Sequence, residues 1–162
     1  MDVSSYSHSE KLRIHRPPAD LYGIVSDVTR VGDLSPVCQS GTWDDATQAG
    51  KTGAWFTGYN AVGDVRWDTR CKVVVAKPGR EFSFINFGPD GDVELVRWGF
   101  TFEESGDGTD VTESWQVLPA YPDFVRAGDP NIDVKPRIDG MAQMAREGIA
   151  ATLANLKRVA ES

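Results

Sequence analysis

Polar and apolar residues alternate along most of the middle of the chain. In VRWDTRCKVVV, residues 65–75, Val65, Trp67, Thr69, Cys71 and Val73 share one parity, and charged residues fill most of the other. A period of two is typical of a strand with one buried and one solvated face. One dry and one wet face indicate an antiparallel rather than a parallel sheet.

The same alternation recurs in short segments separated by turn residues. Lys77-Pro78-Gly79-Arg80 places proline and glycine at the two central positions of a type II turn. Similar glycine-containing turns stand at 88–91 and 105–108. The expected strands lie at 5–15, around Trp43, and at 53–60, 65–75, 81–87, 93–102 and 109–117. Regularly spaced strands with such turns predict an antiparallel meander.

Helical spacing appears in two places. Leu21, Ile24, Val25 and Val28 recur every three or four residues after a proline pair, which predicts a short helix and a second one before Pro36. A longer apolar stripe predicts an amphipathic helix over residues 137–160. That stripe consists of Ile138, Met141, Ala145, Ile149, Leu153, Leu156 and Ala160.

The stretch before this long helix, residues 118–135, is irregular. Pro122, Gly128 and Pro130 interrupt any periodic pattern there. Irregular segments of this length are often mobile and functional. We therefore expect residues 121–133 to be among the most mobile of the chain and to border the entrance of a binding site.

The order of these elements predicts an α+β fold. A curved antiparallel sheet of six to seven strands is expected to wrap around the long C-terminal helix, because that helix is the only long amphipathic element available to cover the dry face. Two short helices follow the first strand. The length of 162 residues fits one domain, residues 1–162.

Composition and charge exclude several classes of function. The net charge is −7 and neither lysine nor arginine forms a run, which excludes nucleic acid as an expected partner because phosphate binding needs a basic patch. No apolar stretch approaches the roughly 20 residues of a spanning helix, so no membrane insertion is expected. The polar N-terminus lacks the apolar core of a signal peptide, which predicts a cytoplasmic location.

Motifs for metals, cofactors and nucleophilic catalysis are absent from the sequence. No Cys-x-x-Cys or His-x-x-x-His spacing occurs, so neither a metal site nor a cofactor is expected. There is no Gly-x-Ser-x-Gly elbow, phosphate loop or dinucleotide fingerprint. Cys38 and Cys71 are the only cysteines, and in a reducing compartment we expect them not to be bonded to each other.

Glu113 is the main candidate for chemistry. It shares the parity of Val111, Trp115 and Val117, so a carboxylate is expected on the buried face of the sheet. Such a group is costly to bury unless it is paired or protonated. Two interpretations remain open: a structural carboxylate paired with an arginine or tyrosine, or a cavity acid that orients a ligand or moves a proton.

The order of elements and several segments resemble the START-like, polyketide cyclase helix-grip superfamily (SRPBCC). The segments are LSPVC (34–38), GAWFTGYN (53–60), RWDTRCKVVVAKPGREFSF (66–84), RWGFTFEE (97–104) and GTDVTESW (108–115). The resemblance covers nearly the whole chain and is closest to actinobacterial-type polyketide cyclase/dehydrase or lipid-transport-like members. Leu34 stands where such members often have tryptophan, a difference that concerns packing near the cavity mouth.

The resemblance implies a hydrophobic cavity between the sheet and the C-terminal helix. Inward parity, helix spacing and the irregular stretch select the residues expected to line it. The expected ligand-binding residues are Trp67, Thr69, Phe84, Trp98, Phe100, Glu113, Trp115, Tyr121, Met141 and Met144. The aromatic residues and methionines are most simply explained as plain core, and a cavity wall is the alternative that the resemblance adds.

Three hypotheses about function follow. The first is a non-catalytic binder or carrier of a small hydrophobic ligand, such as a lipid, polyketide or aromatic. The second is a cyclase or dehydratase in which Glu113 acts as general acid or base. The third is a regulatory or interaction protein whose cavity is vestigial. A closed core favours the third hypothesis, an open apolar cavity the first, and several converging titratable groups the second.

Overall fold

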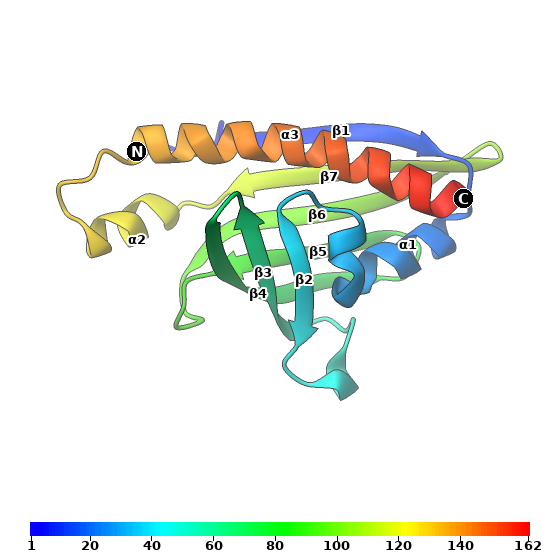
Figure 1. Ribbon diagram of the computed structural model, residues 1–162, viewed down its shortest axis with the longest axis horizontal. Coiled ribbons are helices and arrows are strands. Elements are labelled where there is room, and N and C mark those ends of the chain that lie inside the picture. The colour runs from blue at the N-terminus through cyan, green and yellow to red at the C-terminus, as the bar shows by residue number, and fades with distance from the viewer.

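One curved antiparallel sheet and one long helix dominate the computed structural model, which describes residues 1–162. The sheet has seven strands in the order β1-β7-β6-β5-β4-β3-β2, and it curls beneath helix α3 (Figure 1). The strands are β1 (Ser7–Ile14), β2 (Cys38–Trp43), β3 (Trp55–Val62), β4 (Val65–Lys77), β5 (Glu81–Phe87), β6 (Glu94–Ser105) and β7 (Gly108–Val117). The predicted helix-grip fold is confirmed.

The helices connect and cover this sheet. They are α1 (Pro18–Ser26), the 3-10 helices η1 (Val28–Asp33) and η2 (Ala46–Gln48), α2 (Tyr121–Gly128) and α3 (Val134–Glu161). Helix α3 begins three residues before the expected start, because the Asp133 carboxylate caps it by accepting a hydrogen bond from the Lys135 amide at 3.2 Å. Pro136 is tolerated in the first turn.

The expectation of an irregular segment over residues 118–135 is wrong in part. Residues 121–128 form helix α2, in which Pro122 occupies the first turn. Tyr121 and Val125 are one helical turn apart and are both buried in the core. Their burial stabilises a helix too short to form by propensity alone.

Helix α3 buries its apolar stripe against β1 and β7. Ile138, Ile149 and Leu156 are completely inaccessible to solvent, and α3 lies alongside these two strands (Figure 1). Met141 is the one member of the predicted stripe that stays half-buried. The helix therefore covers one side of the inward face of the sheet, η1 packs on β2, and β3 and β4 between them are less covered.

Helix α1 fills one end of the inward face. The ring of Tyr22 packs edge-on against Phe82, with ring centroids 6.2 Å apart, and against Phe102 at 5.8 Å. Leu21 and Val25 are buried in the same cluster. This end of the protein is closed core, so any open part of the inward face lies toward the opposite end of the strands.

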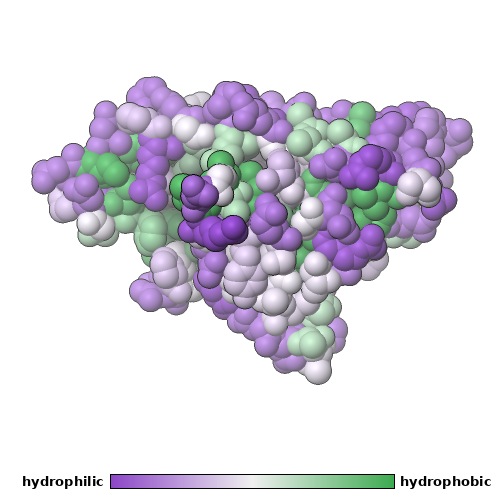
Figure 2. Space-filling model, in the orientation of Figure 1, coloured by the Kyte–Doolittle hydropathy of each residue, from purple (hydrophilic) through white to green (hydrophobic).

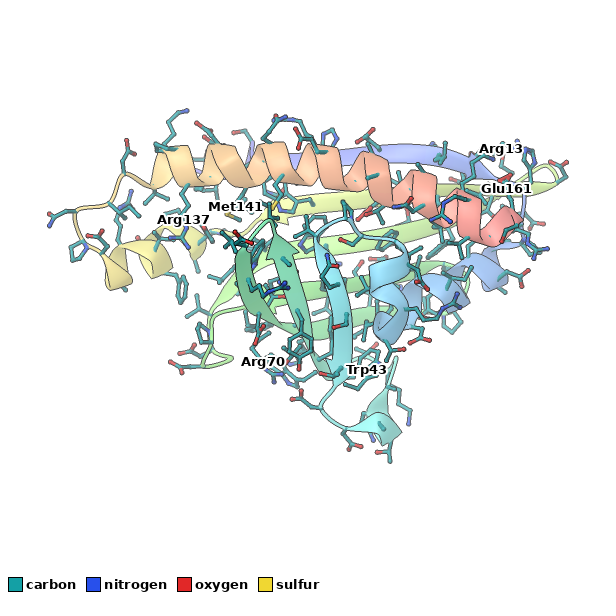
Figure 3. The ribbon with its side chains drawn as sticks, in the orientation of Figure 1. Arg13, Trp43, Arg70, Arg137, Met141 and Glu161 are labelled. Atoms are coloured by element: carbon teal, nitrogen blue, oxygen red, sulfur yellow. The ribbon has the colours of Figure 1, made fainter.

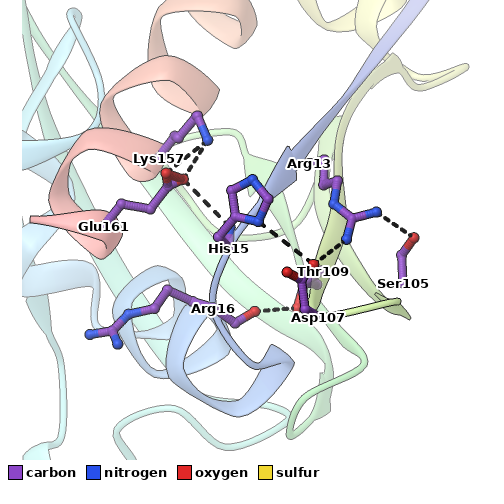
Figure 4. A network of polar contacts seen from close by, with 8 residues as sticks. All are labelled: Arg13, His15, Arg16, Ser105, Asp107, Thr109, Lys157 and Glu161. Atoms are coloured by element: carbon purple, nitrogen blue, oxygen red, sulfur yellow. Dashed lines mark hydrogen bonds and ion pairs between the residues drawn. The ribbon is translucent and has the colours of Figure 1, made fainter.

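A polar network fixes the C-terminal end of α3 to the sheet (Figure 4). Arg16 Nε donates to the carbonyl oxygen of Ala160 at 2.8 Å, and the Thr109 hydroxyl donates to the carbonyl of Arg16 at 2.7 Å. The His15 amide donates to the carboxylate of Glu161, which also pairs with Lys157. Arg16 thereby satisfies the Ala160 carbonyl group at the end of α3, which would otherwise lack a partner.

None of the helices combines the length and the apolar character needed to cross a membrane.

Candidate functional site

The inward face of the sheet carries the predicted aromatic residues, and they fall into two groups. Phe100 and Trp115 are buried beneath α3, with 7% and 3% of their surface exposed. Trp67, Phe84 and Trp98 point to the same side of the sheet but are only half-buried. We call the inward face of β3, β4, β5 and β6 around these three rings the concave face. Its aromatic surface is not fully covered by other protein atoms.

A row of polar side chains crosses the concave face. The Asn60 amide donates to Thr69 Oγ1 at 3.5 Å, and the Cys71 thiol donates to Asn86 Oδ1 at 3.1 Å. Cys71 Sγ also lies 3.8 Å from Thr69 Oγ1, which links the two pairs. Asn60, Thr69, Cys71 and Asn86 form this polar row. Its amide groups keep further donors and acceptors in an otherwise apolar face.

One flank of α3 faces the concave side. Arg137, Met141, Met144 and Gly148 follow each other at spacings of four, three and four residues, which places them on one side of a helix. We call Arg137, Met141, Met144 and Gly148 the α3 flank. Asn155, seven residues after Gly148, donates a hydrogen bond to the carbonyl of Leu34 at the end of η1. A Cβ atom at Gly148 would meet nothing within 4 Å, so there is open space beside it.

Exposed apolar side chains surround this region. Val62 and Val65, partners at the tip of the β3–β4 hairpin, are 47% and 64% exposed, and Met144 on the α3 flank is 41% exposed. Figure 2 shows green surface at this hairpin tip and over α2. Large apolar side chains exposed together indicate a site of interaction.

Arg137 is the only charged member of the α3 flank. Its Nε donates to the hydroxyl of Tyr121 at 3.0 Å, and Tyr121 itself is 5% exposed. Arg137 and Met141 both extend from α3 toward α2 and the β3–β4 hairpin (Figure 3). Tyr121 was expected to line the site with its ring. The ring is instead buried, and the Tyr121 hydroxyl positions the guanidinium of Arg137 at the edge of the site.

Glu113 lies under α3, as its parity predicts. It is 4% exposed, and its Oε2 atom is buried without a hydrogen-bond partner. Burial, reinforced by the nearby negative charge of Glu10, raises the pKa of Glu113 well above its ordinary value. The interpretation of Glu113 as a carboxylate paired with arginine or tyrosine is wrong, because no ion pair or side-chain hydrogen bond of either kind reaches it.

Two further polar residues flank Glu113 on the edge strand. Glu10 of β1 is its direct cross-strand partner, and His8 Nε2 lies 2.9 Å from Glu10 Oε2. His8 and Glu10 are both partly accessible to solvent. His8 and Glu10 are thus paired on the edge strand beside Glu113, without a hydrogen bond to its carboxyl group.

Two surface recesses occur elsewhere on the molecule. One, of about 280 Å³, lies between residues 1–4 and 116–119, and the other, of about 220 Å³, lies beside Asp27 and Trp43. Neither contains a residue predicted for the site. No group of three or more histidine, cysteine, aspartate or glutamate side chains is arranged to hold a metal ion.

The structure thus divides the predicted site residues. It brings Trp67, Thr69, Phe84 and Trp98 together on the concave face, and it puts Met141 and Met144 on the α3 flank. Phe100 and Trp115 are core, and Glu113 is buried beside them.

Sequence reasoning missed Asn60, Arg137 and Gly148 as site residues. The parity of Asn60 with Phe56 on β3 indicates an inward side chain. The positions of Arg137 and Gly148, four and seven residues from Met141, put them on its side of the helix.

The sequence profile described as polyketide cyclase / dehydrase and lipid transport matches residues 7–161. The chain belongs to this family. No curated protein matches it. The family accounts for the order of elements seen here, and it includes by its description both cyclases and lipid carriers.

Solved structures place this polyketide cyclase family member among known folds. A polyketide cyclase-like protein, Cgl2372 from Corynebacterium glutamicum, is 33% identical over 99% of this chain and 94% of its own, with a TM-score of 0.69. The di-domain aromatase/cyclase BexL from the BE-7585A biosynthetic pathway is 17% identical, with a TM-score of 0.71 over 96% of this chain and 50% of BexL. Protein Ms6760 from Mycobacterium smegmatis, 15% identical over 98% of this chain and 96% of its own, shares the fold with a TM-score of 0.66.

The two thiols of this family member are free, as expected. Burial raises the pKa of Cys71 to about 12, and it also raises the pKa of Cys38. Because the thiolate is the reactive form, we expect both to react slowly with a thiol reagent at about pH 8 in the native protein, and Cys71 more slowly. In denaturant, without a reducing agent, both thiols should react rapidly with the reagent. Fast reaction of Cys71 in the native state would contradict its burial.

Proposed function

We propose that the protein binds and carries a small, largely apolar molecule on the concave face, against the α3 flank. The observation that carries this proposal is the exposure of inward-pointing aromatic rings. Trp67, Phe84 and Trp98 point toward the helix side of the sheet, yet none is fully buried. An aromatic ring on the inward face of a sheet normally contributes to the core.

The energetic reason is the burial of apolar surface. Each ring still in contact with water gains about 25 cal/mol for every Å² that a ligand covers. Met141 and Met144 on the opposite side are flexible and adapt to ligands of different shape. The space beside Gly148 allows a ligand to approach the helix backbone closely.

The polar row supports a ligand that carries hydroxyl or carbonyl oxygens. Asn60 and Thr69 are half-buried, and Asn86 uses its side-chain oxygen for the Cys71 thiol. The Asn86 amide nitrogen has no partner within the protein, so it is free to donate to such an oxygen. A few polar groups in an apolar site fix the orientation of the ligand.

The proposal is tested by filling the space beside the α3 flank. Gly148→Leu places a bulky side chain there, so we expect it to weaken binding of the neutral probe N-phenyl-1-naphthylamine by about tenfold or more, measured by fluorescence titration. Ala150→Leu is the control: Ala150 is exposed on α3, and it lies two residues after Gly148, about 160° around the helix from it. Both variants introduce the same side chain, and leucine is a good helix former.

The control separates blocking of the site from a general effect of an added leucine on the helix. Ala150→Leu is expected to bind the probe as the unmodified protein does. Equal binding by both variants, or no binding by the unmodified protein, would overturn the proposed site.

A second candidate function is that of a cyclase or dehydratase. A carboxyl group whose pKa is raised by burial, such as Glu113, is suited to donate a proton to a departing hydroxyl group, which then leaves as water. If this function holds, Glu113→Gln should abolish conversion of a poly-β-ketoacyl thioester to a cyclised, dehydrated product. The same variant should retain binding of N-phenyl-1-naphthylamine. Unchanged product formation would exclude Glu113 as the acid.

A further inference from the structure

We propose that the ligand carries an anionic group and that the guanidinium of Arg137 holds it at the edge of the concave face. The ligand would then be an amphiphile, with its apolar body on the rings of the concave face and its acidic end at α3. This inference rests on the proposed function and specifies the chemistry of the molecule bound there.

The first argument is that Arg137 has no acidic partner. Its neighbours Arg126 and Lys135 form ion pairs with Asp123 and Asp139, respectively. Arg137 forms no ion pair, and its only side-chain hydrogen bond is the one from Nε to Tyr121. In a protein of net charge −7, a cation without an acidic partner in this position leaves its two terminal nitrogens available to a ligand.

The second argument is that the guanidinium is held in place. The hydroxyl of Tyr121 accepts from Nε at 3.0 Å, and Tyr121 is anchored in the core by its buried ring. An arginine fixed through Nε still presents both terminal nitrogens in one plane, a geometry suited to two oxygens of a carboxylate, sulfonate or phosphate. Preorganisation also lowers the entropy lost when an anion binds.

The third argument is that apolar side chains surround Arg137. Met141 lies one helical turn after Arg137, and half-buried Phe124 and Ile132 belong to α2 and the loop that follows it. Figure 3 shows Arg137 directed into the region between α3 and α2. Arg137 itself is exposed, so the acidic end of a ligand can reach the guanidinium from solvent while its apolar body contacts these side chains.

Two fluorescent probes that differ by one group provide the test. 8-Anilinonaphthalene-1-sulfonate carries a sulfonate, and N-phenyl-1-naphthylamine is the same ring system without it. For Arg137→Gln we expect about tenfold weaker binding of the sulfonate probe and a change of less than about twofold for the neutral probe. Arg137→Lys should recover part of the loss, because it restores the charge without the planar fork.

Arg146→Gln is the matched control for charge. Arg146 is nine residues after Arg137, on the opposite side of the same helix, and it is also exposed. Arg146→Gln should leave the affinities for the sulfonate probe and for the neutral probe unchanged. Higher salt should weaken binding of the sulfonate probe to the unmodified protein and not to Arg137→Gln.

The outcomes separate this inference from the proposed function. If both probes bind and Arg137→Gln changes neither affinity, or both equally, the anionic end group is wrong and the concave site stands. If Arg146→Gln has the same effect as Arg137→Gln, the effect is one of net charge and the inference is again overturned. If neither probe binds the unmodified protein, the proposed function fails first and this inference fails with it.

Discussion

Replacing Glu113 with glutamine is expected to raise the stability of the protein relative to its parent progressively as the pH rises above 4.5, the ordinary pKa of a glutamate. The unfolded chain releases the Glu113 proton near pH 4.5, whereas the pKa of the folded protein lies well above that value. Between these two values the native state binds more protons than the unfolded state. Its free energy of unfolding therefore falls by up to about 1.4 kcal/mol per pH unit, and the variant lacks this loss.

The measurement is urea denaturation of both proteins at a series of pH values. The observable is the slope, against pH, of the difference between the two free energies of unfolding. The glutamine amide adds an offset of its own to that difference, but the offset does not depend on pH. Glu10→Gln is the informative companion: it removes the neighbouring charge, lowers the pKa of Glu113, and should narrow the pH range over which stability is lost. If the free energies of unfolding of the parent and of Glu113→Gln change with pH in parallel, Glu113 has an ordinary pKa in the folded protein.

A single methyl group at Gly32 is expected to destabilise the protein severely. A Cβ atom there would lie 2.1 Å from the carbonyl oxygen of Gln39 and 3.0 Å from its carbonyl carbon. Both are backbone atoms at β2, so no side-chain rotation relieves the overlap. We expect Gly32→Ala to cost about 3 kcal/mol and to lower the melting temperature by about 10 °C.

Gly140→Ala is the control for this prediction. Gly140 is in the exposed part of α3 and has nothing within 4 Å of an added Cβ atom. Alanine is expected to stabilise that helix by about 0.5–1 kcal/mol. A melting temperature for Gly32→Ala within about a degree of the parent would show that η1 and β2 are packed less tightly than the approach of Gly32 to the Gln39 carbonyl indicates.

Alternation and helix spacing predicted most of the architecture. The strand at 81–87 has the expected bounds, and the parity of β7 correctly placed Glu113 on the helix side of the sheet. These features depend on local sequence, because a period of two or of 3.6 is visible within a few residues. The short helix α2 was missed because its stability comes from burying Tyr121 and Val125 in a core built by other segments.

The candidate site was predictable only in part. Parity assigns Phe84 and Phe100 to the same side of the sheet, but it does not reveal which of them α3 covers. That depends on where the helix lies across the sheet, which is a tertiary property. Arg137 gave no signal because an exposed arginine in a helix is ordinary. Its significance appears only once Tyr121, sixteen residues earlier, is seen to hold it.

The strand order has a consequence for the order of events during synthesis on the ribosome. β1 is made first but pairs only with β7, where Ser7 meets Gln116 and Ile14 meets Thr109. The other strands pair with sequence neighbours through successive hairpins. While those hairpins emerge, Leu12 and Ile14 have no strand to join, and α3, which packs on β1, follows β7 in the chain. The nascent chain thus carries β1 unpaired until β7 has been translated.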